Sequence, residues 1–229
     1  MNNLRLKPFK LQRKDGKIVD VILYDFTNIA DVEVLDIKEL KFAGIRVKDI
    51  KKSDIHSEVL KDKSKSYFQN KYSKMVAGLS KRHLNKIIST VFTRDIESRN
   101  AYLKKELIAN VGLIFYTAIP ILKHVELKKL ALYENQIIHR FALPLKIGGL
   151  TFFAMITVKE RTDNEELQID EFSIYDLYSE IQNKKSPGSS STVSKRTFRS
   201  HYQMTNYSIY DLFDFVKSSI TKSNNNSTR

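Results

Sequence analysis

The chain has 229 residues, enough to bury a core in one domain or in two small ones, and its formal net charge is +13. It contains no cysteine, which excludes disulfide bonds and thiolate zinc sites. No secretory signal follows the basic N-terminus, and the longest apolar run, residues 111–122, is too short to span a bilayer. We expect a cytoplasmic protein without membrane insertion, with delivery to another cell by a specialised route as an alternative.

The positive charge is unevenly distributed along the chain. Residues 61–120 hold 12 Lys and Arg against 4 Asp and Glu, a net charge of +8. Residues 121–185 hold 9 against 10, a net charge of −1. A basic block of this kind favours a polyanionic partner, with nucleic acid first. Lysine that only keeps the protein soluble is the alternative interpretation.

Residues 1–50 are expected to form a β-rich N-terminal region. A turn signal, Lys-Asp-Gly-Lys at residues 14–17, precedes a run with strand composition. Residues 37–50 fit either a short helix or another strand. Residues 51–77 are rich in Lys, Ser and Asp and poor in large apolar residues, so they predict a linker or a solvated helix.

Two helices are predicted next. Ser80 is a good N-cap, and an apolar stripe with helical spacing follows it, made of Leu84, Ile87, Ile88, Val91 and Phe92. A second helix is expected from about Asp95 to Thr117, and Pro120 ends it or lies just beyond its end. The candidate nucleic-acid contacts are the cations outside the apolar positions, namely Lys81, Arg82, Lys86, Lys104 and Lys105.

A β-hairpin follows these helices. The glycine pair at residues 148–149 lies between two long aliphatic and aromatic runs, and it predicts two strands joined by a two-residue turn. The turn fixes the register, so Ile147 faces Leu150 and, further along, His139 faces Val158. The face that carries His139 is almost wholly apolar and should be buried.

The opposite face of the hairpin is mixed. It places Arg140 opposite Thr157, with Lys159 close by, and two cations beside a hydroxyl suit a phosphate group. An ordinary solvated sheet face is the alternative. His139 and Arg140 point to opposite sides of the strand, so a site that used both would need a bulge or a strand end.

The remaining residues complete the predicted organisation. Residues 167–181 are expected to add one or two strands, although 172–181 also fit a helix. A flexible linker is predicted at 183–207, a C-terminal helix at 208–222 and a disordered tail at 223–229. The fold class is therefore α+β: within residues 78–182, N-terminal helices pack on a small antiparallel β-meander, and the β-rich N-terminal region is additional.

Several kinds of chemistry have no motif in this chain. It lacks a glycine-rich phosphate loop, a dinucleotide fingerprint and an HExxH helix, and its five histidines show no metal-ligand spacing. We therefore predict no cofactor and no metal. Metal-free acid–base chemistry, or binding alone, remains.

The order of these elements resembles that of the large polyvalent protein-associated domains of phage and mobile-element proteins, which are similar to the barnase/EndoU/colicin/RelE-like group of toxin ribonucleases. The resemblance covers about residues 78–181 and rests on the segments SKRHLNKIISTVF, IIHRFALPL, GGLTFFAMITVKE and IYDLYSEI. Its best parts are HRF at residues 139–141 and TVKE at 157–160. The segment SIYDLFDFVK, residues 208–217, looks like a terminal element often seen after such domains.

The resemblance implies metal-independent cleavage of RNA, in which the 2′-hydroxyl attacks the adjacent phosphate with help from an acid, a base and a cation. The implied roles are acid or base for His139, phosphate binding for Arg140 and Lys159, a hydrogen bond from Thr157, and assistance from Tyr178. His139 as a core histidine is the alternative, with His124 or His201 in its place. Tyr178 as a half-buried strand tyrosine is likewise an alternative.

Three functions stay open from the sequence. The first is a metal-independent, ribonuclease-like toxin or effector domain, which would have an immunity or antitoxin protein as partner. The second is a non-enzymatic nucleic-acid- or protein-binding module of phage or mobile-element origin, with RNA expected rather than DNA. The third is a structural phage protein whose charge is incidental.

Overall fold

In the computed structural model of this protein, the described residues are 5–12, 16, 18–25, 32, 34–61, 63–92, 99–125, 136–147, 150–160, 167–176 and 216. Their strands are β1 (Arg5–Gln12), β2 (Ile18–Asp25), β3 (Leu35–Ile37), β4 (Lys65–Gln69), β5 (Val76–Ser80), β6 (Ile119–Val125), β7 (Ile137–Ile147), β8 (Leu150–Glu160) and β9 (Leu167–Asp176). Their helices are α1 (Lys52–Leu60), α2 (Lys81–Phe92), α3 (Arg99–Ala109) and α4 (Val111–Thr117), with a short 3-10 helix at Val47–Asp49.

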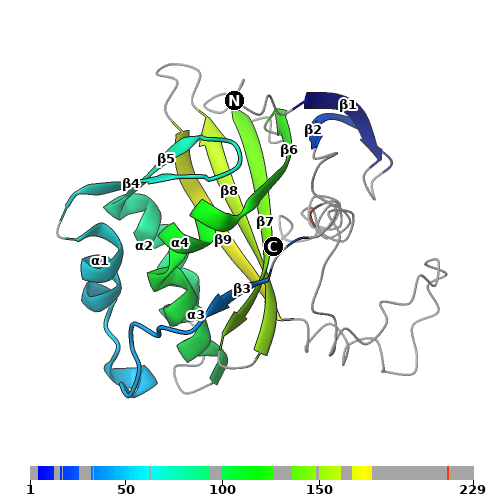
Figure 1. The fold of residues 1–229 in the computed structure, drawn as a ribbon. Coiled ribbons are helices and arrows are strands. Elements are labelled where there is room, and N and C mark those ends of the chain that lie inside the picture. Colours follow the sequence, from blue (N-terminus) through cyan, green and yellow to red (C-terminus); the bar gives the residue numbers. More distant parts are fainter. Residues whose placement is uncertain are drawn as a thin grey trace.

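The nine strands of the described residues belong to one mixed sheet, with the order β1-β2-β6-β7-β8-β9-β5-β4 and with β3 paired to β7 (Figure 1). The predicted fold class, helices on a small antiparallel meander, is therefore wrong. Strands β7, β8 and β9 do pair antiparallel in chain order, but the sheet continues on both sides of them. The parallel pairs β5–β9 and β3–β7 join segments far apart in sequence, and a local residue pattern does not specify such partners.

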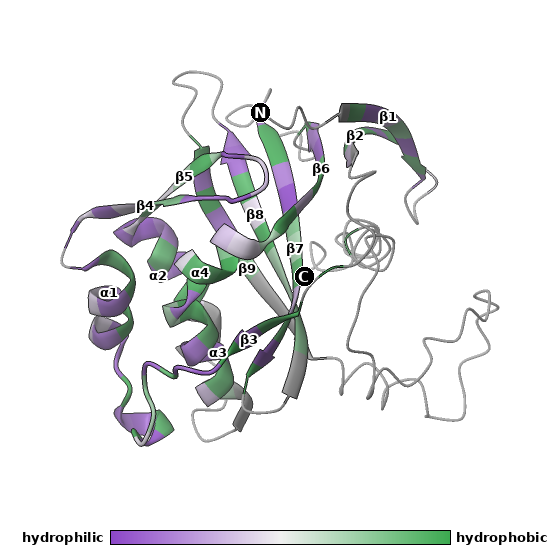
Figure 2. Cartoon of the chain, viewed as in Figure 1, coloured by the Kyte–Doolittle hydropathy of each residue, from purple (hydrophilic) through white to green (hydrophobic). Residues whose placement is uncertain are grey.

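The predicted register of the β7–β8 hairpin is confirmed at every pair. On one face, Phe141 and Ile156 join a large core that includes buried residues of all four helices. On the other face, Ala142 and Met155 join a second core with residues of β1, β2 and β6. Figure 2 shows the hydrophobic residues along β7 and β8 and the hydrophilic ones along β4. The middle of the sheet is thus covered on both sides.

Helix α2 begins where the sequence predicts. The backbone N–H of His83 donates to Ser80 Oγ at 3.4 Å, so Ser80 caps the first turn. Leu84 and Ile88, from the predicted apolar stripe, are fully buried. The helix therefore presents its apolar side to the large core and its cations to the surface.

The second predicted helix is divided into α3 and α4 at Asn110, whose ψ of 13° departs from helical geometry. The side-chain Nδ2 of Asn110 donates to the Glu106 carbonyl at 2.9 Å, and such local bonds compete with the helical backbone pattern. Six apolar residues of this region are buried, namely Leu103, Leu107, Val111, Ile114, Phe115 and Ala118. The predicted start near Asp95 lies outside the described residues.

The segment predicted as a linker or solvated helix, residues 51–77, contains α1 and β4. Ile55, Val59 and Leu60 are buried in the large core, so this segment is part of the folded unit. Its Lys- and Ser-rich composition is explained by the outward sides of α1 and β4. The N-terminal strands also belong to the same sheet, since β2 pairs with β6 and β3 pairs with β7.

The side chain of Asn70 forms hydrogen bonds that join the connection between β4 and β5 to the end of α4. Its Nδ2 donates to the carbonyl oxygens of Phe115, at 2.7 Å, and Ala118, at 2.6 Å. Its Oδ1 accepts hydrogen bonds from the backbone N–H groups of Tyr72 and Ser73. The side chain is completely buried, and both ends of its carboxamide are used.

The C-terminal predictions fall mostly outside the described residues. From the predicted helix at 208–222, Val216 alone is described; it is helical and fully buried in the second core. Residues 172–176 are in β9, so the strand alternative holds for them. The rest of that segment, the linker at 183–207 and the tail at 223–229 are not among the described residues.

Candidate functional site

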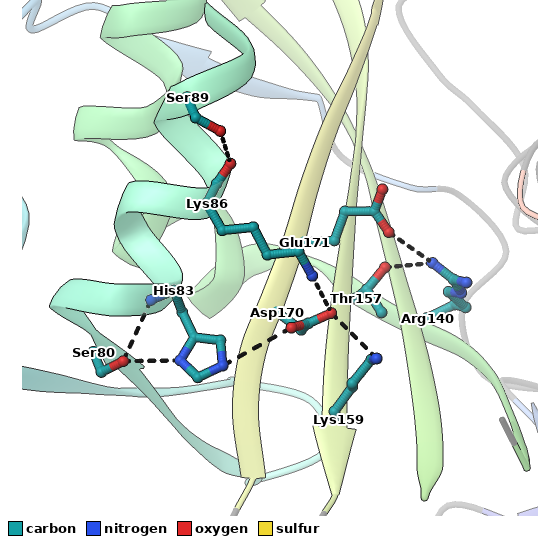
Figure 3. Close-up of polar contacts among 9 residues, drawn as sticks. All are labelled: Ser80, His83, Lys86, Ser89, Arg140, Thr157, Lys159, Asp170 and Glu171. Atoms are coloured by element: carbon teal, nitrogen blue, oxygen red, sulfur yellow. Dashed lines mark hydrogen bonds and ion pairs between the residues drawn. The ribbon is translucent and has the colours of Figure 1, made fainter. Parts of the chain in front are cut away.

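Arg140, Thr157 and Lys159 lie on one face of the hairpin, as the register requires. Arg140 Nη1 donates a hydrogen bond to Thr157 Oγ1, and the same nitrogen is 3.7 Å from a carboxylate oxygen of Glu171 on β9 (Figure 3). The Arg140 side chain is 15% exposed. Its guanidinium is therefore held between the hydroxyl of Thr157 on β8 and the carboxylate of Glu171 on β9.

A β-bulge in β9 places Asp170 among cations. The pairing of β8 with β9 shifts by one residue between Thr157 and Val158, and Asp170 is the extra residue. Its carboxylate lies 2.8 Å from Nζ of Lys86 on α2 and 3.5 Å from Nζ of Lys159 on β8 (Figure 3). One carboxylate thus receives a cation from the helical layer and another from the sheet.

The pKa of Asp170 reflects these neighbours. Burial alone would raise the pKa of the carboxyl group, because the side chain is 12% exposed. The hydrogen bond from Lys86 and the positive charges of Lys159, Lys86 and His83 outweigh burial and hold the pKa below its ordinary value. Asp170 is therefore ionised at neutral pH and neutralises part of the charge around it.

His83 lies between Ser80 and Asp170 at the start of α2. Its Nδ1 is 2.8 Å from Ser80 Oγ, and its Nε2 is 3.9 Å from Asp170 Oδ1 (Figure 3). This order is that of a hydrolase triad, but 3.9 Å is too long for a hydrogen bond. The Ser80 hydroxyl also accepts the N–H that caps the helix. The three side chains therefore hold the helix end and form no proton relay.

The charge around His83 is mostly positive. Burial is the largest cause that lowers the pKa of His83; Asp170 raises it, and three cations lower it further. These cations are Lys86 and Arg82 of α2 and Lys65 of β4. We call the combined group the Asp170 cluster; it consists of Lys65, Arg82, His83, Lys86, Lys159 and Asp170.

His139 lies apart from this cluster and is 2% exposed. Its Nε2 is 2.9 Å from a carboxylate oxygen of Glu160, and its Nδ1 is 2.9 Å from the Tyr24 hydroxyl of β2. Because a carboxylate only accepts, Nε2–H donates to Glu160 and Nδ1 accepts from Tyr24. Burial lowers the pKa of His139, against the opposing effect of Glu160. Both ring nitrogens are occupied, as expected for a core histidine.

The other predicted acid–base residues are placed as follows. His124 is 5% exposed, and its Nδ1 is 2.7 Å from the carbonyl oxygen of Val125. Tyr178 and His201 lie outside the described residues. The structure therefore brings Arg140, Thr157 and Lys159 together, and it leaves His139 and His124 in separate buried positions.

The predicted nucleic-acid contacts divide into exposed and buried cations. Lys81, Arg82 and Lys86 are exposed on α2, and Lys104 is exposed on α3. Lys105 is 2% exposed, and its Nζ donates to the carbonyl oxygens of Val47 at 2.8 Å and Ile50 at 3.2 Å. Burial lowers its pKa. Lys105 therefore holds the chain before α1 and is not part of the surface.

Sequence reasoning missed Lys65, His83 and Asp170. The composition of residues 51–77 predicts a linker or a solvated helix, so it does not indicate the strand that positions Lys65. His83 and Lys86 are three residues apart, which puts them on one side of α2, and this spacing was an available signal. Asp170 reaches the cluster through a bulge, and strand alternation alone does not reveal a bulge.

A pocket of about 410 Å³ lies elsewhere, between the β3 region, α1, β4 and the junction of α3 with α4. Its charged lining is balanced, with the lysines Lys38, Lys41 and Lys61 and the acids Asp36, Glu39 and Glu58. Lys41 and Glu58 form an ion pair at 3.4 Å. A pocket with equal numbers of both charges does not favour a polyanion, whereas the Asp170 cluster does.

No family model, curated protein or solved structure matches this chain. Among the described residues, no three His, Asp or Glu side chains are grouped so that they would hold a metal ion. No helix in the described part of the chain has the length and apolar character needed to cross a membrane. The contacts and charges of the described residues therefore carry the functional proposal.

Proposed function

We propose that this protein is a non-enzymatic nucleic-acid-binding module and that the Asp170 cluster, together with the start of α2, is its contact surface. The observation that carries the proposal is the charge of the cluster: Lys86 and Lys159 lie against the carboxylate of Asp170, and the positive charges of Lys65, Arg82 and Lys86 act on His83 beside it. A concentrated positive patch of this kind attracts phosphates and releases their counterions.

Helix α2 adds cations that extend this patch. Lys81 and Arg82 are exposed, and among the described residues neither forms an ion pair with an acid. Lys86 keeps most of its side chain at the surface, with 58% exposure, although it also bonds Asp170. Such cations position a phosphate backbone without selecting a base sequence. RNA rather than DNA stays a prediction from the sequence.

The contacts of His139, Arg140 and Lys159 support binding rather than catalysis. An acid–base group needs a proton path to its substrate, but both nitrogens of His139 bond internal partners. Arg140, which is expected on the phosphate, lies against Glu171, and Lys159 lies against Asp170 within the Asp170 cluster rather than beside His139. Ribonuclease activity stays a prediction from the resemblance.

Salt-dependent binding tests the proposal. Labelled single-stranded RNA is titrated with the protein at several salt concentrations, and the logarithm of the association constant is plotted against that of salt. Lys81→Glu and Arg82→Glu are each expected to weaken binding and to reduce the slope by about 0.7 for every phosphate that the variant no longer neutralises. Lys48→Glu, an equal change of charge at an exposed residue of the 3-10 helix, is the matched control and should behave like the native protein.

Three results would overturn the proposal. The first is an absence of binding at low salt. The second is equal weakening of binding by Lys48→Glu, which would mean that only the net charge of the protein matters. The third is cleavage of RNA, because total RNA incubated with the protein and EDTA is expected to stay intact. Cleavage that persists in EDTA and disappears in Arg140→Ala or Lys159→Ala would establish the ribonuclease instead.

A further inference from the structure

Tyr67 is a large aromatic side chain left at the surface beside the Asp170 cluster. It lies on β4, the last strand of the described sheet, and is 62% exposed. Lys65 Nζ lies over its ring, 5.1 Å from the ring centre. The same lysine acts electrostatically on His83. The ring is therefore joined to the cluster through a shared cation.

The sheet register shows how this aromatic side chain is placed. Tyr67 pairs with Gly78 on β5, Gly78 pairs with Gln168 on β9, and Gln168 pairs with Lys159 on β8. Paired residues of neighbouring strands share a face, so these four form one row across the sheet. With strands about 4.8 Å apart, the row from Tyr67 to Lys159 is roughly 14 Å long.

Gly78 is what lets Lys65 lie beside the ring. A Cβ built on Gly78 would stand 2.2 Å from Cε of Lys65 and 3.4 Å from Cε1 of Tyr67. The stem of Lys65 therefore occupies the space above Gly78 and directs its ammonium toward Tyr67. Val76, two residues before Gly78 on the same face, is 49% exposed and enlarges the apolar area next to the ring.

An exposed tyrosine on an edge strand often only reflects the strand preference of aromatic residues. Two observations distinguish Tyr67 from that case. Its ring is bordered by a cation of the proposed contact surface, and the opposite face of β4 is the one that serves the core, through Phe68. Tyr67 is thus not needed for packing, and its exposed ring lies next to the ammonium of Lys65.

We infer that Tyr67 is a base-stacking platform and that the ligand is single-stranded nucleic acid, an inference that rests on the proposed function. Bases of a single strand expose their flat faces, and stacking on an aromatic ring tolerates every base. The bases of a duplex are already stacked and are closed to such a ring. The cations of the Asp170 cluster hold the phosphates, while Tyr67 holds a base.

The chain contains no tryptophan, so Tyr67→Trp introduces a single fluorescent reporter at the platform. Titration with a short oligouridine strand should quench this fluorescence. Tyr116→Trp is the matched control, because Tyr116 is 49% exposed on α4, the helix that packs on the Phe68 side of β4. Its fluorescence should not change. Equal quenching of both reporters, or of neither while the strand is bound, would overturn the inference.

Affinity provides the second measurement. Tyr67→Ser should weaken binding of the single strand about 5- to 100-fold, the range for one stacked base, whereas Tyr67→Phe should keep most of the affinity. An abasic strand with the same phosphates should bind both variants equally. If Arg82→Glu weakens binding and Tyr67→Ser does not, the proposed contact surface is supported and the stacking role of Tyr67 is refuted. A protein that binds no strand at low salt would remove the proposed function itself.

Discussion

Lys86 on α2 and Asp170 on β9 are joined by a 2.8 Å hydrogen bond across 84 residues of sequence. The Lys86 side chain is 58% exposed and that of Asp170 is 12% exposed, so the ammonium meets solvent while the carboxylate is enclosed. The pair is an internal tie between helix and sheet, and it is also part of the proposed contact surface. Removing the charge of Asp170 should therefore lower the stability of the fold and strengthen nucleic-acid binding.

Asp170→Asn keeps the shape of the side chain and removes its charge. We expect the free energy of unfolding to fall by about 2 kcal/mol at neutral pH, since the charge-assisted hydrogen bond to Lys86 and the ion pair with Lys159 are removed. Nucleic-acid binding should become tighter, because a negative charge leaves the cluster. Urea denaturation and the RNA titration measure the two effects.

The stability effect of Asp170→Asn should depend on pH. The folded pKa of Asp170 is lowered, so its contribution is complete above the ordinary value of 3.8 and disappears as pH falls through the folded pKa. The native protein and the variant should therefore converge in stability in strong acid. A difference that stays constant with pH would mean that the carboxylate charge is not the cause.

The adjacent residues Lys104 and Lys105 provide a matched pair. Lys105→Met keeps the apolar stem but leaves the carbonyl oxygens of Val47 and Ile50 without their donor, so we expect a loss of about 1 to 3 kcal/mol. Lys104→Met changes an exposed side chain and should alter stability by less than about 0.5 kcal/mol. Thermal or urea unfolding compares them, and equal losses would contradict the buried role of Lys105.

The local parts of this fold were predictable and the long-range parts were not. The glycine pair at 148–149 fixes the β7–β8 register, and Ser80 with its apolar stripe fixes the start of α2. The sequence does not reveal β4, because within the described sheet this strand pairs with β5 alone and exposes Tyr67, and its polar residues give it the composition of a loop. The pairing of β5 with β9 depends on chain closure over a long distance.

The candidate site was also predictable only in part, because it depends on contacts between segments that are far apart in sequence. The hairpin register correctly put Arg140, Thr157 and Lys159 on one face. The carboxylates that neutralise two of them, Glu171 and Asp170, come from the next strand, and Asp170 is displaced by the bulge. The positions of cations in a sequence do not reveal which of them have an internal partner.

Stability should decrease in mild acid because of the buried histidines. Burial lowers the folded pKa of His139 and of His83 below the ordinary value of 6.5, so the unfolded chain binds more protons as pH falls through that value. We expect the free energy of unfolding to fall from about pH 7 to about pH 5. The fall should be smaller in His139→Gln, measured by urea denaturation at each pH.

His56→Gln is the control for the acid effect. The His56 ring is partly exposed and lies 3.0 Å from the side-chain oxygen of Asn85. A flatter slope in His56→Gln than in His139→Gln would show that the buried ring is not the group that resists protonation.

Asn70→Asp should be strongly destabilising although the two side chains have the same shape. The change replaces the donor that bonds the carbonyl oxygens of Phe115 and Ala118 by a buried carboxylate, and we expect a loss of at least about 3 kcal/mol at neutral pH. The loss should shrink in acid, where the new carboxyl group regains a proton to donate. Ser73→Ala, which removes one hydroxyl bonded to Asn70, should cost about 1 kcal/mol.

Because both faces of β7 and β8 are covered in their middle, the proposed contact surface uses the rim of the sheet and the outward side of α2. Residues there, such as Tyr67, Lys81 and Arg82, contribute little to either core. Selection for a different ligand would therefore meet few structural penalties at these positions. The residues that set the binding properties can therefore be exchanged without rebuilding the cores beneath them.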